Sequence, residues 1–94
     1  MDFFELVKTG MPQDVQAAIR NGADVNAWFF NGRTPLMCAA GFNKNPEVTT
    51  VLLKAGADPK AKDRMGRTAL DYAEQYNANL KGTDTYRQLQ GASQ

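Results

Sequence analysis

The sequence predicts an all-α repeat solenoid, in which stacked helix-turn-helix units are joined by short β-hairpin loops. The main observation is an internal period of 34 residues, because nine of the eighteen residues from 22 to 39 are identical to those from 56 to 73. A fixed period of this length is typical of proteins built from stacked supersecondary units. Helix-start residues and turn residues recur at matching places in the period, and they complete the prediction.

The helix signals follow the same order in each unit. Thr34 can accept a hydrogen bond from a free backbone N–H and Pro35 fits the first helical position, so a helix is expected to begin there. Asn45 and Pro46 repeat this signal at the start of a second apolar pattern. Gly56 then supplies the left-handed residue that ends a helix. Each unit is therefore expected to contain a hairpin followed by two helices.

The segment AWFFNGRT contains the turn signal between two units. Asn31 and Gly32 form the dipeptide that most readily supplies the positive φ angles of a tight turn. Trp28, Phe29 and Phe30 are therefore expected on or beside a hairpin tip. A tip has few buried places, so three large aromatic side chains there need an explanation other than turn formation.

Length and composition limit the class of protein. The 94 residues, 43% of them hydrophobic, suit one compact domain. A net charge of +1 does not favour nucleic-acid binding. The first ten residues have no basic region followed by a long apolar run, so we expect neither a signal peptide nor a membrane span. We expect an intracellular, cytoplasmic protein, in agreement with the single cysteine.

The composition argues against catalysis. The chain has no His, which removes the commonest general base and the usual partner of a catalytic thiol. It also lacks a glycine-rich phosphate loop and the best zinc ligands. Cys38 is expected to be a small buried packing residue. We therefore predict that the protein is not an enzyme and has no catalytic residue, metal site or cofactor.

The segments GRTPLMCAA, PEVTTVLLKAGADPKAKD and GRTALDYA resemble the ankyrin repeat. The resemblance divides the chain into an N-terminal capping repeat over 1–27, a full repeat over 28–61 and a C-terminal capping repeat over 62–94. The family's His is replaced by Met37 and Asp71, so the hydrogen bond that His would make is expected to be absent. The last helix is expected in TDTYRQL, with Thr83 as its cap and Tyr86 and Leu89 facing inward.

The resemblance implies a binding module whose hairpin fingers and first-helix face form a concave surface that grips other proteins. In the third unit the finger keeps the family's Asp as Asp63, whereas Phe29 replaces it in the middle unit. Trp28 and Phe30 occupy alternating positions that face the groove, and clustered exposed aromatics are typical of contact surfaces. The alternative is that these rings pack on the hairpin base and the next finger. The candidate partner-binding residues are Trp28, Phe29, Phe30, Arg33, Phe42, Lys62, Arg64, Met65, Arg67 and Tyr76.

Charge indicates what kind of partner fits. Basic residues gather on the two fingers, which favours a partner protein with an apolar plug flanked by carboxylates. Two alternatives remain open. The aromatic finger could pair two copies as a homodimer, or its rings could hold a methylated lysine, although three adjacent residues rarely converge on one cation. Phe42 and Tyr76 either extend the patch into the groove or serve inter-repeat packing.

Overall fold

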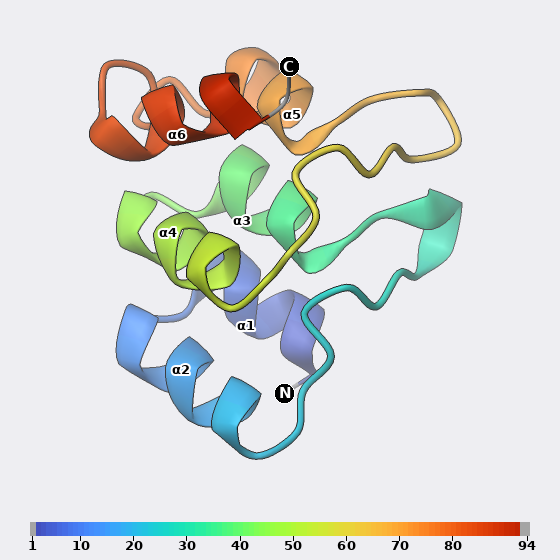
Figure 1. Ribbon diagram of the computed structural model, residues 1–94, viewed down its shortest axis with the longest axis vertical. Coiled ribbons are helices and arrows are strands. Elements are labelled where there is room, and N and C mark those ends of the chain that lie inside the picture. Colours follow the sequence, from blue (N-terminus) through green and yellow to red (C-terminus); the bar gives the residue numbers. More distant parts are fainter. Residues whose placement is uncertain (1, 93–94) are drawn as a thin grey trace.

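The computed structural model describes residues 2–92, which form three helix pairs stacked along one direction (Figure 1). This arrangement confirms the predicted all-α repeat solenoid. Between the helix pairs, only a short 3-10 turn at Phe30–Gly32 and a single antiparallel bridge interrupt irregular backbone in the described residues. The helices are α1 (Phe3–Thr9), α2 (Pro12–Arg20), α3 (Pro35–Phe42), α4 (Pro46–Lys54), α5 (Ala69–Tyr76) and α6 (Asp84–Ala92).

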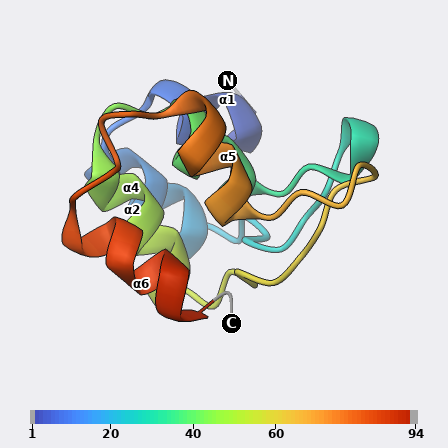
Figure 2. The ribbon, with the colours of Figure 1, turned by 90° about the horizontal axis from the view of Figure 1, so that it is seen from above.

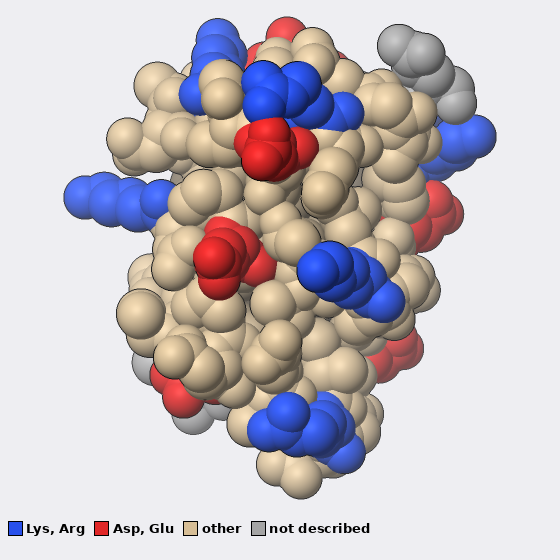
Figure 3. Space-filling view, turned by 60° about the vertical axis from the view of Figure 1, so that its left-hand side comes forward, with Lys and Arg blue, Asp and Glu red and all other residues tan. Residues whose placement is uncertain are grey.

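The six helices form two layers. The first helices α1, α3 and α5 lie in one layer and the second helices α2, α4 and α6 in the other, while the connecting segments project together to one side (Figure 2). Acidic and basic side chains are both present on the side where α2, α4 and α6 lie (Figure 3). Within residues 2–92, no helix combines the length and the apolar character that crossing a bilayer requires.

The helix boundaries follow the signals in the sequence. The Thr34 hydroxyl accepts a hydrogen bond from the Met37 N–H at 3.3 Å, and the Asn45 side chain accepts one from the Glu47 N–H at 3.0 Å. Both caps precede a proline at the first helical position. Gly56 has a φ of 100° directly after α4. The predicted starts of α3 and α4 and the predicted end of α4 are therefore confirmed.

The last helix also forms where it was expected. The Thr83 hydroxyl accepts a hydrogen bond from the Tyr86 N–H at 3.1 Å, so Thr83 caps α6 as predicted. Leu89 is fully buried and Tyr86 packs half-buried against the core. The inward placement of both residues is confirmed.

The positions where the resemblance expects His close the helix starts in another way. The Thr34 N–H donates to the Met37 sulfur at 3.4 Å, and the Thr68 N–H donates to the Asp71 carboxylate at 3.0 Å. Each pair completes a reciprocal cap at the first turn of its helix. Local capping contacts therefore occupy both positions.

The core runs through the stack along α3. Cys38 and Tyr72, which lie 34 residues apart, are both buried, as predicted. A Cβ added at Gly41 would lie 3.2 Å from the Tyr72 side chain, so the small residue allows α3 and α5 to approach closely. Asn side chains bind the ends of neighbouring first helices, because Asn43 donates to the Val7 carbonyl at 2.9 Å and Asn77 repeats this role one unit further on.

Candidate functional site

The first finger, residues 28–33, is closed by a tight turn. The Gly32 N–H donates to the Phe29 carbonyl at 2.7 Å, and the Phe29 N–H donates to the Arg33 carbonyl at 3.0 Å. Asn31 and Gly32 have φ angles of 65° and 75°. The Asn-Gly pair therefore supplies the two positive φ angles predicted for it, and the three aromatic residues lie on the strand leading into the turn and on the turn itself.

The second finger, residues 62–67, repeats the outer hydrogen bond with a polar sequence. The Asp63 N–H donates to the Arg67 carbonyl at 3.0 Å. The fingers also contact each other, because the Arg64 N–H donates to the Asn31 carbonyl at 2.8 Å. A Cβ added at Gly32 would lie 3.4 Å from the Arg64 nitrogen, so the two backbones meet closely at this point. The fingers therefore form one surface.

Asp63 locks the second finger to α5. Its buried carboxylate accepts hydrogen bonds from the Tyr72 hydroxyl at 2.5 Å, from the backbone N–H groups of Met65 and Arg67, and from the Arg67 Nε at 3.0 Å. Burial alone raises the pKa of Asp63, but these hydrogen bonds and the Arg67 charge outweigh it and hold that pKa below its ordinary value. Asp63 is thus a paired, structural carboxylate.

Phe29 occupies the corresponding position of the first finger and also points inward. Its ring packs against Phe4 of α1, with the ring centroids 3.9 Å apart. Phe29 is half-buried in this contact and packs on the core. Among the candidate residues, Phe29 therefore lies behind the first finger, in the place that the packing alternative gave it.

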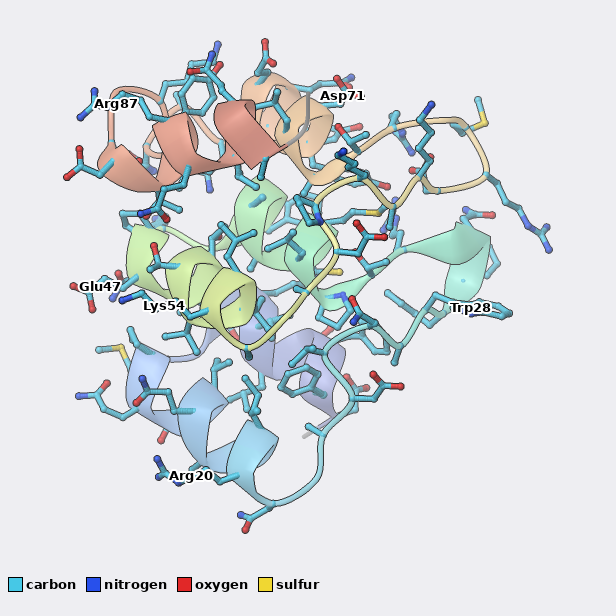
Figure 4. All side chains as sticks on the ribbon, in the orientation of Figure 1. Arg20, Trp28, Glu47, Lys54, Asp71 and Arg87 are labelled. Atoms are coloured by element: carbon cyan, nitrogen blue, oxygen red, sulfur yellow. The ribbon has the colours of Figure 1, made fainter. Side chains whose placement is uncertain are left out.

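Trp28 and Phe30 lie on the outside of the same finger. Their side chains are 73% and 77% exposed, and Met65 at the tip of the second finger is 76% exposed. Trp28 lies at the far end of the fingers from the helices (Figure 4). A recess of about 510 Å³ between the fingers is lined by Trp28, Lys62 and Arg64. The structure thus brings aromatic and basic candidate residues together around one hollow.

A second group of candidate residues lies beside the inner ends of the fingers. Phe42 and Tyr76 stack with their ring centroids 5.4 Å apart and remain 39% and 47% exposed. Arg67 donates a hydrogen bond to the Tyr76 hydroxyl at 3.2 Å, and Lys8 lies 5.5 Å from the Phe42 ring centroid. These contacts hold an aromatic pair between two cations.

Arg33 completes this group. Its guanidinium lies 5.8 Å from the Tyr72 ring centroid, and Arg67 lies over the same ring at 4.9 Å. The Nε of Arg33 is buried and has no hydrogen-bond partner within residues 2–92. A buried donor without an acceptor is costly, so this group would gain from a carboxylate supplied by a bound partner.

Two features of this surface were not found from the sequence. Lys8 was not among the candidates because its contact with Phe42 joins residues far apart in the chain, and no period links them. The Tyr72 hydroxyl was predicted only to pack, yet it binds Asp63. Asp63 and Tyr72 lie nine residues apart in one unit, and their counterparts Phe29 and Cys38 cannot make this bond, so the repeat comparison gave no signal.

Cys38 has the environment of a packing residue. Burial raises the pKa of its thiol to about 11, against an ordinary value of 9.0. The thiolate is the nucleophilic form, so this thiol is poorly suited to attack a substrate near neutral pH.

Stacked helix pairs with a row of lateral fingers and an exposed aromatic and basic surface define a repeat protein of the binding class. A family model described as ankyrin repeats, in three copies, matches residues 3–85. The chain belongs to the ankyrin-repeat family, whose members generally act as protein-interaction modules and not as catalysts. The division at residues 27/28 and 61/62 stays a prediction.

Known relatives share part of this sequence. The chain is 46% identical to the mitochondrial disaggregase of Bos taurus over 59 residues, which are 63% of this chain and 9% of that protein. The human mitochondrial disaggregase gives the same identity over 59 residues and 8% of its length. Protein HOS4 of Saccharomyces cerevisiae is 30% identical over 90 residues, which are 96% of this chain and 8% of that protein. The chain spans less than a tenth of the length of each of these relatives.

Proposed function

We propose that this protein binds a partner protein through a finger surface and performs no catalysis itself. The finger surface comprises the exposed Trp28, Phe30, Lys62, Arg64 and Met65, bordered by Arg33, Arg67, Phe42 and Tyr76. The observation that carries the proposal is the contrast within the first finger. Phe29 finds a packing partner in Phe4, whereas Trp28 and Phe30 stay exposed on either side of it.

The finger surface is held in place before any partner arrives. The backbone bond from Arg64 to Asn31 joins the two fingers, and the Asp63 carboxylate ties the second finger to Tyr72. A surface held in this way loses less conformational entropy on binding, which favours affinity. Exposed Trp and Phe on such a support are the side chains that contribute most to interface energies.

The charges favour a partner with an apolar plug flanked by carboxylates. Lys62 and Arg64 are exposed and form no ion pair within residues 2–92, whereas the acid between them, Asp63, is already bound by Arg67. The recess beside Trp28 therefore presents unneutralised positive charge next to an aromatic face. Complementary carboxylates would speed encounter and set the orientation of the partner. An intracellular, cytoplasmic setting fits the free, buried Cys38.

A peptide-display selection tests the proposal. A random peptide library is selected on the chain and counter-selected on the Trp28→Ala/Phe30→Ala variant. We expect the enriched peptides to combine an aromatic or aliphatic residue with acidic neighbours, and to lose binding to that variant. Lys62→Glu/Arg64→Glu should separately weaken binding of the acidic peptides. Peptides that bind both aromatic variant and parent equally well would contradict the finger surface as the binding site.

A further inference from the structure

A second hollow lies away from the fingers, on the layer of second helices. It is a groove of about 750 Å³ lined by residues of α2, α4 and α6 and of the loop before α6. The apolar part of its wall includes Ile19 and Val51, both half-buried. We call this the second-helix face. It lies on the side of the molecule that Figure 3 brings forward, away from Trp28 in Figure 4.

Charges of opposite sign mark the two ends of α4 on this face. Glu47 lies in the first turn and Lys54 in the last, and both line the groove. They are seven residues apart, which is about two helical turns, so they share one side of the helix about 10 Å apart. Arg20, at the end of α2, adds a second positive charge beside Lys54. The face is therefore acidic at one end and basic at the other.

These charges are unpaired within the chain. Glu47, Lys54 and Arg20 are exposed, and none of them takes part in an ion pair among residues 2–92. By contrast, Asp84 at the start of α6 is paired with Arg87. The helix dipole favours an acid at the first turn and a base at the last, which accounts for the signs. It does not account for their common placement along one groove.

We propose that a second copy of this chain docks on the second-helix face, with the two α4 helices antiparallel. The midpoint between Glu47 and Lys54 lies between Thr50 and Val51, both half-buried in the groove wall. A two-fold axis through that midpoint brings Glu47 of each copy to Lys54 of the other. The arrangement forms two equal ion pairs around an apolar centre.

The charge pattern selects a second copy over other occupants. A face that is acidic at one end and basic at the other is complementary to itself under two-fold rotation, as an isologous interface requires. A partner of uniform charge would be repelled by one end of the face. Because exposed ion pairs are weak and the apolar wall is small, the dimer is expected to be weak and sensitive to salt. The fingers stay free, so a dimer would present two finger surfaces if the proposed function holds.

Sedimentation equilibrium at low ionic strength tests this dimer. The parent chain should dimerise with rising concentration, and Glu47→Lys or Lys54→Glu alone should weaken the dimer at least ~10-fold, because like charges then face each other across the axis. An equimolar mixture of the two single variants should form a heterodimer, since one chain then carries two positive charges and the other two negative ones. Lys62→Glu, the same charge change on a finger, is the matched control and should leave the dimer intact.

The mixture separates a lost contact from a lost fold, because a chain that failed to fold could not be rescued by its complement. The Trp28→Ala/Phe30→Ala variant should also retain the dimer. A parent chain that stays monomeric over the whole concentration range would overturn the proposal. So would single variants that dimerise as well as the parent, or a dimer that disappears with Trp28 and Phe30. None of these results would bear on peptide binding by the finger surface.

Discussion

Phe29 and Asp63 occupy the same position in successive fingers, 34 residues apart, and both point inward although one is aromatic and the other charged. Phe29 packs on Phe4, and Asp63 accepts hydrogen bonds from Tyr72 and Arg67. Each finger is thus fixed at its base by the chemistry available behind it. The exposed residues on either side of this anchor are left free to serve another purpose.

The first finger offers a direct comparison between a supporting ring and a displayed ring. Phe29→Ala should destabilise the fold by about 1 to 2 kcal/mol, because it removes a half-buried ring and its contact with Phe4. Phe30→Ala should change stability by no more than about 0.5 kcal/mol, since its ring is exposed. Chemical denaturation of both variants checks this prediction. Equal losses would mean that Phe30 also supports the fold.

Asp63 should make the stability depend on pH in the acid range. Its pKa in the folded chain lies below the ordinary value of 3.8, so its stabilising contribution is complete above that value. The contribution is lost as the pH falls through the folded pKa. Asp63→Asn should therefore cost about 1 to 3 kcal/mol at pH 7. The gap between parent and variant should narrow below about pH 4.

Urea denaturation of both chains between pH 7 and pH 2.5 measures that gap. A gap that stays constant over this range would show that the Asp63 charge contributes nothing. Tyr72→Phe is a useful companion, because it removes one donor to the carboxylate and leaves the Arg67 ion pair in place.

Asn77 should contribute to the stacking of the last two helix pairs. Its side chain donates to the carbonyls of Ala40 and Asn43 at 3.0 and 2.8 Å, in a buried place. Asn77→Ala leaves both carbonyls with one partner fewer and should cost about 1 to 3 kcal/mol. Asn79→Ala is a nearby control at an exposed position. Thermal unfolding that is equally affected by both substitutions would contradict the stacking role.

Cys38 should be almost unreactive in the folded chain. A rise in its thiol pKa from 9.0 to about 11 lowers the thiolate fraction at pH 8 about 100-fold, and burial restricts access further. Labelling with iodoacetamide should thus be slow in buffer and fast in denaturant. Fast labelling of the folded chain would show that Cys38 is accessible.

Much of the fold could be predicted because its signals are local and repeated. Pro35, Asn45 and Gly56 each act within their own turn, and the period copies such signals from unit to unit. The side-chain partners could not be predicted, because they join positions that no period relates. Phe29 meets Phe4 in the neighbouring unit, and the sequence left open whether its ring faces outward or packs inward.

The affinity of one selected peptide for the parent chain and for Trp28→Ala/Phe30→Ala tests the central claim most directly, with thermal unfolding of both chains measured alongside. The account predicts that affinity falls at least ~100-fold while the unfolding temperature hardly changes, because both rings are exposed anchors. An unchanged affinity would contradict the finger surface as the binding site. A large fall in unfolding temperature would show instead that the two rings belong to the fold.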